Sequence, residues 1–204
     1  MKRILITGFM PFNNASLNPA WEAVKGVTAP EGVELVKKEI SVVFGQAIDE
    51  LLQAVEELHP DAVICVGLAQ GRNGITPERV AINVNDARIP DNAGACPVDE
   101  AIRADGPAAY FTKLPIKAIV EAINAAGIKS QVSNTAGTYV CNNIMYGLLY
   151  AIDHQYPDMI GGFIHVPAST EMLPEIPEGT PVFELADITK GLTIAVEETE
   201  KACR

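Results

Sequence analysis

Short apolar runs alternate along this chain with segments of helical periodicity, and this alternation is the strongest constraint on its fold. The runs Arg3–Thr7, Asp61–Leu68 and Met159–Val166 are rich in aliphatic residues and end near glycine or proline, as is typical of buried strands. Between the first two, Gln46–Leu58 repeats isoleucine, leucine and valine at helical spacing, which predicts an amphipathic helix. Strands that alternate with helices indicate an α/β fold.

The remaining elements extend the same pattern. Further strands are predicted at Val33–Val43, Arg79–Asn85 and Lys129–Asn134, and further helices from Asn18-Pro19 and over Ile116–Ala126, Thr138–Gln155 and Asp187–Ala202. We expect a three-layer α/β/α sandwich around a mostly parallel mixed sheet. No linker divides the chain, so residues 1–204 are expected to form a single domain.

One long segment interrupts the pattern. Ala87–Pro107 is rich in proline, glycine, aspartate and asparagine, and loops of this length are usually lids, interfaces or disordered segments. With Tyr110 and Phe111 it could form a subunit interface, or it could simply cover the edge of the sheet. The sequence alone leaves both alternatives open.

The charge balance excludes two classes of partner. The formal net charge is −11, from 26 acidic and 15 basic residues, so no basic stripe is available to neutralise phosphates. We therefore expect no binding to nucleic acid and no attraction to anionic membranes. No apolar run approaches the roughly 20 residues that a membrane-spanning helix requires.

The cysteines indicate a reducing environment. Cys65, Cys96, Cys141 and Cys203 are widely spaced and include no C-x-x-C pair, so we expect reduced thiols, no disulfide and no metal site. The basic start Met1-Lys2-Arg3 leads into a short apolar stretch that resembles a strand more than a signal peptide. The expected location is the cytoplasm.

Cys141 is the first candidate for chemistry. It follows the predicted strand Lys129–Asn134, a turn, and Thr138, which is a candidate helix cap. In the first helical turn, unpaired N–H groups and the helix dipole would stabilise a thiolate and hold an oxyanion. Position alone also fits a buried structural cysteine.

His165 and Glu78 are the candidate partners. His165 ends the strand Met159–Val166, at the sheet edge where ligands bind in parallel sheets and where the Cys141 helix begins. Glu78 precedes the strand Arg79–Asn85 and would orient the imidazole. No spacing rule ties Glu78 to His165, and the carboxylate equally fits a solvated loop or a partner for Arg79.

Several separate motifs, in order from residue 3 to near residue 200, resemble those of the pyrrolidone-carboxylate peptidase (pyroglutamyl peptidase I) family. They are Thr7–Phe12 with Asn18-Pro19, Pro77–Asn83, Asp86–Asn92, Ser133–Asn142 and His165–Pro167. The resemblance implies a cysteine peptidase that removes N-terminal pyroglutamate from peptides, without a cofactor and commonly as a homotetramer. It implies a catalytic triad of Cys141, His165 and Glu78 acting through a thioester.

The resemblance also implies a set of substrate contacts. Phe9 and Phe12 would line the pocket for the pyroglutamyl ring, with Ile89 and Val140 nearby and Arg88 supporting the oxyanion or the pocket. Three departures from the family pattern stand out. Asn13-Asn14 replaces two glycines, Met10 stands where an acid is common, and Gly67–Arg72 reads G-L-A-Q-G-R instead of G-Q-A-G-G-R.

Two rival functions remain open on the sequence. Another amidohydrolase, such as a glutaminase-type enzyme, would share the same three side chains. A catalytically silent homologue that only binds a small ligand is kept open by the altered Asn13-Asn14 loop. A test of a pyroglutamyl amide beside glutamine as substrates would distinguish the peptidase from the glutaminase-type enzyme. Alkylation of Cys141 well below the roughly 8.5 pKa of an ordinary thiol would distinguish an active enzyme from the silent homologue.

Overall fold

The chain is built on one mixed sheet whose strands run in the order β2-β1-β3-β7-β4. A computed structural model describes residues 1–203. The strands of this sheet are β1 (Lys2–Phe9), β2 (Val33–Ile40), β3 (Ala62–Leu68), β4 (Thr76–Pro77) and β7 (Ile160–Val166). The first three and β7 are parallel, whereas β4 is antiparallel to β7. The mostly parallel mixed sheet predicted from the sequence is confirmed.

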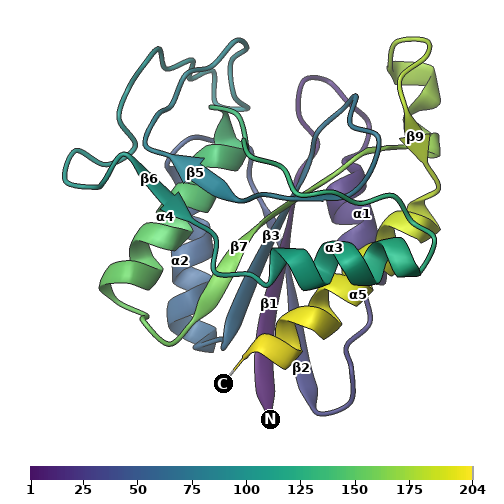
Figure 1. Ribbon diagram of the computed structural model, residues 1–204. Helices are drawn as coiled ribbons and strands as arrows, with labels where there is room; N and C mark the ends of the chain where they lie inside the picture. Colours follow the sequence, from purple (N-terminus) through teal and green to yellow (C-terminus); the bar gives the residue numbers. More distant parts are fainter. Residues whose placement is uncertain (204) are drawn as a thin grey trace.

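Helices cover both faces of the sheet (Figure 1). One layer consists of α1 (Pro19–Gly26), α3 (Ile116–Ala125) and α5 (Leu185–Ala202), and the other of α2 (Gln46–Leu58) and α4 (Val140–His154). The predicted α/β/α sandwich is therefore confirmed. The long loops gather at the carboxyl ends of the parallel strands, opposite the N-terminus (Figure 1).

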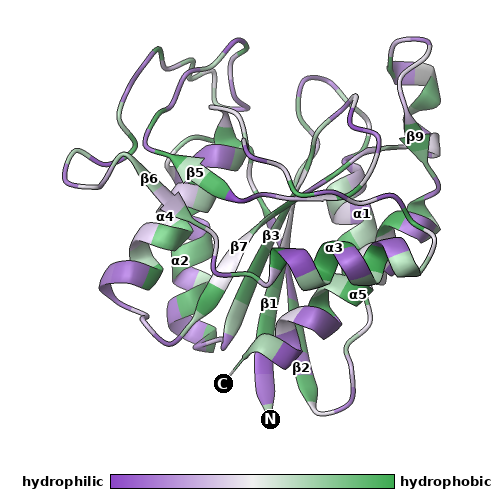
Figure 2. Cartoon of the chain, viewed as in Figure 1, coloured by the Kyte–Doolittle hydropathy of each residue, from purple (hydrophilic) through white to green (hydrophobic). Residues whose placement is uncertain are grey.

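Burial explains why these segments form these elements. In β3 all residues from Ala62 to Gly67 are buried, as a strand covered on both faces requires. Helix α2 instead buries one stripe, Ala47, Leu51, Ala54 and Val55, and Figure 2 shows hydrophobic and hydrophilic residues alternating along the helices. The sequence pattern thus decides which segments lie in the middle layer and which lie outside.

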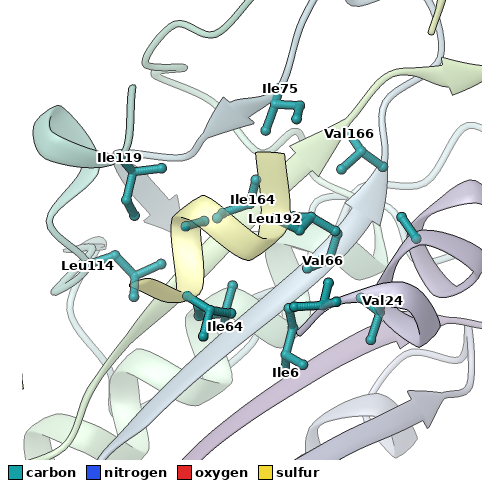
Figure 3. Packing of buried hydrophobic residues seen from close by; sticks show 14 of the residues in the cluster. Ile6, Val24, Ile64, Val66, Ile75, Leu114, Ile119, Ile164, Val166 and Leu192 are labelled. Atoms are coloured by element: carbon teal, nitrogen blue, oxygen red, sulfur yellow. The ribbon is translucent and has the colours of Figure 1, made fainter. Parts of the chain in front are cut away.

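The core under α3 and α5 is aliphatic. Figure 3 shows Ile119 of α3 and Leu192 of α5 packed with Ile64 of β3 and Ile164 of β7. All four side chains are fully buried, and such burial stabilises the fold by about 1.5–3 kcal/mol for each side chain.

Two predicted strands are corrected by the structure. Lys129–Asn134 forms only isolated bridges, Ser130 to Ile75 and Ser133 to Glu78. Arg79–Asn85 shortens to β5 (Val80–Ile82), which pairs with β6 (Ala109–Phe111) outside the main sheet. The Asn83 side chain bonds the backbone of Arg103 instead, and such local bonds compete with a strand ladder.

The predicted helix boundaries fare better, with one exception. Asn18 caps α1 as predicted, since its Oδ1 accepts a hydrogen bond from Ala20 N. Thr138 does not cap α4. Its hydroxyl donates to Asp86 O at 2.7 Å, and the helix begins after Tyr139.

The end of the long loop and the segment before it are tied to α4. Asn142 accepts a hydrogen bond from Ile82 N and donates to the oxygens of Ile82 and Val84. Tyr146 donates to Pro107 O and Tyr150 to Asp105 Oδ2, at the end of the loop. These bonds hold both segments against the helix that carries Cys141. The remaining short elements are β8 (Ala168–Ser169), the 3-10 helix η1 (Thr170–Glu175) and β9 (Val182–Phe183).

Candidate active site

His165 and Glu78 are brought together by two neighbouring strands. His165 lies near the end of β7, and Glu78 directly follows β4, which runs beside β7 in the opposite direction. The Glu78 N–H donates to Phe163 O at 2.9 Å, and His165 Nδ1 lies 2.7 Å from Glu78 Oε1. Both side chains are buried. The antiparallel edge strand therefore delivers the carboxylate to the imidazole.

Neither alternative for Glu78 fits this geometry. The carboxylate is fully buried, so it does not belong to a solvated loop. Arg79 Nε donates to Asn134 Oδ1 instead of to Glu78.

Arg72 is a site residue that the sequence reasoning missed. One guanidinium nitrogen donates to Glu78 Oε1 at 2.6 Å and to Thr76 Oγ1 at 2.5 Å, and the other donates to Thr135 O at 2.9 Å. The arginine thus pairs the buried carboxylate and joins it to the segment before α4. Its position could have indicated a site residue, because Gly67–Arg72 leads out of β3 at the carboxyl end of the strand. Ligands bind at that edge of a parallel sheet.

Cys141 lies in the first turn of α4 and is half-buried. Its sulfur lies over Gly67 of β3, where a Cβ atom would be 3.0 Å from Cys141 Sγ and 2.7 Å from Phe163 Cζ. Gly67 pairs with His165 in the register of β3 and β7. The absence of a side chain at Gly67 therefore makes room for the sulfur beside the strand that carries the histidine.

The pKa of the Cys141 thiol differs from the sequence-based expectation. Burial lowers the pKa of His165, although the Glu78 hydrogen bond opposes this effect. Burial, with added repulsion from Glu78, raises the pKa of Cys141 to about 12. The predicted low thiol pKa is wrong because desolvation of a thiolate in this apolar surrounding outweighs the stabilising groups, including Arg72.

Cys141 and His165 line one cavity of about 260 Å³. Its wall also includes Phe9, Phe12 and Val140, three of the five residues predicted to contact substrate. Arg72 and Tyr139 are further members. The cavity is thus an apolar chamber with a thiol and an imidazole exposed to it.

The other two predicted contacts lie elsewhere. Ile89 lines a second cavity of about 330 Å³, which shares Phe12 and Leu68 with the first. Arg88 is exposed and is not among the residues that line either cavity.

The other cysteines are less suited to chemistry. Cys65 is fully buried within β3, where desolvation raises its pKa to about 12. Cys203 is also buried, whereas Cys96 is exposed in the long loop. Across residues 1–203, no cluster of histidine, cysteine and carboxylate side chains has the arrangement of a metal site. None of the helices described here combines the length and apolarity needed to cross a membrane.

A thiol at a helix start and a carboxylate-bound imidazole face one apolar chamber, on the edge of the sheet where α/β enzymes bind ligands. Nucleophile, base and orienting group are the parts that a cysteine-type hydrolase requires.

The comparisons with known proteins define the class further. A family model described as pyroglutamyl peptidase matches residues 2–202. The chain is similar to a pyrrolidone-carboxylate peptidase of Streptococcus pyogenes serotype M4, with 51% identity over 195 residues, 95% of this chain and 90% of that protein. The chain belongs to the pyroglutamyl peptidase family of cysteine-type hydrolases, and the resemblance seen in the sequence is confirmed.

Solved structures agree with this assignment. The fold is similar to that of pyroglutamyl peptidase I from Bacillus amyloliquefaciens, with a TM-score of 0.93 and 48% identity over 97% of this chain and 94% of that one. It is also similar to a mutant pyrrolidone carboxyl peptidase from Pyrococcus furiosus, with a TM-score of 0.92 and 38% identity over 98% of both chains.

Proposed function

We propose that this protein hydrolyses the amide bond after an N-terminal pyroglutamyl residue, with Cys141 as nucleophile, His165 as base and Glu78 as the group that orients the imidazole. The observation that carries this proposal is the 2.7 Å contact between His165 Nδ1 and Glu78 Oε1 beside the cavity that Cys141 lines. Family membership supports the substrate class.

The carboxylate selects the tautomer of the histidine. A carboxylate accepts hydrogen bonds, so the proton on His165 resides on Nδ1 and points to Glu78. His165 Nε2 is then free to accept the proton of the Cys141 thiol. When the imidazole becomes a cation, Glu78 stabilises it.

The resting pair is a thiol and a neutral imidazole, because burial raises the pKa of Cys141 and lowers that of His165. Transfer of the thiol proton to His165 therefore accompanies attack on the substrate carbonyl. Alkylation of the free enzyme by iodoacetamide is accordingly slow at neutral pH and accelerates above the pKa of an ordinary thiol. Rapid alkylation at pH 6 would contradict this resting state.

The reaction then follows acyl transfer. The sulfur adds to the carbonyl that joins the ring to the next residue, and the oxyanion binds the unpaired N–H groups at the start of α4. His165 donates its proton to the departing amine as the thioester forms. Water, deprotonated by His165, then cleaves the thioester and regenerates the thiol. These steps require no cofactor.

The apolar wall accounts for the choice of substrate. The pyroglutamyl ring is uncharged and compact, and the rings of Phe9 and Phe12 offer surfaces for its faces. An N-terminal glutamate would bring an ammonium and a carboxylate into the same chamber, where both would be poorly solvated. We therefore expect cleavage of pyroglutamyl peptides and no cleavage of the uncyclised forms.

The decisive experiment measures amine release from pyroglutamyl-aminomethylcoumarin, with glutamine as an alternative substrate. We expect turnover of the coumarin amide only, and loss of turnover after complete alkylation of Cys141. Ammonia release from glutamine would favour the glutaminase-type rival. Absence of turnover on both substrates would favour a silent binding protein.

Three further properties belong to the same proposal. Residues 1–204 would act as one catalytic domain, because the cores on both faces of the sheet are built on the same strands. The homotetramer and the cytoplasmic location rest on the sequence-based expectations above. Light scattering of the purified protein tests the first of these two, and cell fractionation tests the second.

A further inference from the structure

The second cavity adjoins the catalytic one and has a distinct chemistry. It has a volume of about 330 Å³ and shares Phe12 and Leu68 with the cavity that holds Cys141 and His165. Four residues that replace the family pattern in the sequence line it, namely Asn13, Asn14, Leu68 and Gln70. Two of the three departures from the family pattern, at Asn13-Asn14 and in Gly67–Arg72, therefore lie at one place beside the catalytic chamber.

Asn13 and Asn14 keep the backbone that their position requires. Their φ angles are 52° and 59°, in the left-handed region that glycine favours and asparagine tolerates. The loop thus adopts a conformation that suits a pair of glycines while it adds two amide groups to the cavity wall.

Among the described residues that line this cavity, Glu175 carries the one charged side chain. Its Oε2 accepts a hydrogen bond from Ser16 N at 3.0 Å, and bonds from Ser16 hold the pKa of the carboxyl below its usual range. The carboxylate is therefore ionised at neutral pH. Met172, Ile89 and Ile176 supply apolar surface beside it.

We propose that this second cavity receives the side chain of the residue that follows pyroglutamate, and that Glu175 makes lysine or arginine the preferred residue there. The inference rests on the proposed function, since the ring must occupy the catalytic cavity and present its carbonyl to Cys141. The leaving peptide then extends past the shared Phe12 and Leu68. A long apolar stem with a cationic end matches the aliphatic wall and the carboxylate.

The expected preference is modest. Glu175 is exposed, and ion pairs between exposed groups change an equilibrium by about two- to fivefold. The same carboxylate, in a chain of net charge −11, repels a glutamate at that position by a similar factor. Both effects decrease as salt is raised, because surface charges are screened.

The experiment compares kcat/KM for pyroglutamyl dipeptide amides whose second residue is lysine, glutamine, glutamate or alanine. We expect lysine to exceed glutamine by about two- to fivefold and glutamate to fall below it by a similar factor, with both differences shrinking in 0.5 M salt. Cleavage of all four amides at equal rates would overturn the inference and leave the proposed function intact. Failure to cleave any of them, including alanine, would instead overturn the proposed function.

Three variants assign the preference to this carboxylate. Glu175→Gln should remove the lysine preference, measured as the ratio of kcat/KM for the lysine amide to that for the glutamine amide. Glu178→Gln removes an equal charge from an exposed position nearby that does not line the cavity, and it should keep the preference. Gln70→Glu adds a carboxylate to the wall of the cavity and should increase the preference for lysine. A Glu175→Gln variant with an unchanged ratio of lysine to glutamate would contradict the proposal.

Discussion

The helices on the two faces of the sheet bury different kinds of side chain. Under α1, α3 and α5 the core is almost wholly aliphatic, as the packing of Ile119 and Leu192 illustrates. The core under α2 and α4 also includes buried amides and phenols, among them Asn142, Asn143 and Tyr146. These groups hydrogen-bond to the loops and the strand that lie beside α4, at Ile82, Asn85 and Pro107.

The two faces therefore contribute differently to the stability of the fold and to the geometry of the site. A buried polar group adds little net stability when it is hydrogen-bonded, yet leaving it unpaired costs about 1–3 kcal/mol. The α4 face therefore gains little stability from its amides, but it gains a fixed geometry for the loops. The opposite face supplies mainly apolar burial, and it reaches the cavity through the N-cap of α1, Asn18. Substitutions on the two faces should consequently separate activity from stability, and the following variants test that separation in order of expected effect.

Cys141→Ala tests the face that carries the chemistry. We expect a loss of activity of the order of 10⁶-fold, as is typical when a catalytic nucleophile is removed. The free energy of unfolding should change by no more than about 1 kcal/mol, because the side chain is small and half-buried. Pyroglutamyl-amide hydrolysis and urea unfolding measure the two quantities. Full activity of the purified variant would refute the mechanism.

Glu78→Gln tests the orienting group. We expect a decrease in kcat/KM of about 10⁴-fold, comparable to the loss when the triad carboxylate of a hydrolase becomes an amide. The Glu78 hydrogen bond raises the pKa of His165 against the effect of burial. Without it that pKa falls further, so the acid limb of the pH profile should move to lower pH. Glu171→Gln, an exposed substitution outside the cavities, is the control. A shift to higher pH would contradict this role.

Ile119→Ala tests the opposite face. Ile119 of α3 is fully buried in the aliphatic core, so truncation should lower the free energy of unfolding by about 2–5 kcal/mol, whereas Ile119→Val should lower it by about 0.5–1.5 kcal/mol. Under conditions where the variants are folded, kcat should equal that of the wild type. Urea unfolding and amide hydrolysis give both values. A large loss of kcat in folded Ile119→Ala would show that the two faces are coupled.

Arg72 joins Glu78 to the segment before α4, and its substitution should have the smallest of these effects. Arg72→Met removes hydrogen bonds to charged and carbonyl oxygens, so we expect kcat/KM to fall about 10–100-fold. Arg72 also lowers the pKa of His165, so the acid limb should move to higher pH, opposite to Glu78→Gln. Arg72→Lys should be more active than Arg72→Met, since lysine keeps the positive charge but lacks the several donors of the planar guanidinium. An unchanged pH profile would show that Arg72 has a structural role only and does not influence the pKa of His165.

The sequence predicted the centre of the fold well and its edges poorly. Strands β1, β3 and β7 are continuous apolar runs buried on both faces, and their local pattern is sufficient to define them. The two-residue β4 and the bridges at Ser130 and Ser133 depend on the strands beside them. No local pattern encodes such pairings, because they are decided by tertiary contact.

The candidate site likewise depends on tertiary contacts that no local sequence pattern encodes. Sheet topology alone placed His165 and the Cys141 helix at one edge, and the structure agrees. Glu78 reaches the histidine from the end of β4, and Arg72 reaches Glu78 from the turn after β3. No sequence periodicity joins these positions. The resemblance to a family supplied Glu78, and nothing supplied Arg72. The thiol pKa was predicted in the wrong direction, since the helix start was visible in the sequence and the desolvation was not.

His165 and Glu78 are fastened to adjacent strands by main-chain hydrogen bonds, whereas Asn13, Asn14 and Gln70 belong to separate loops. Insertions or exchanges in those loops can therefore change which leaving group is accepted without shifting the proton relay. Proteins descended from such a chain can differ in the peptides they cleave while they keep the same acid–base residues.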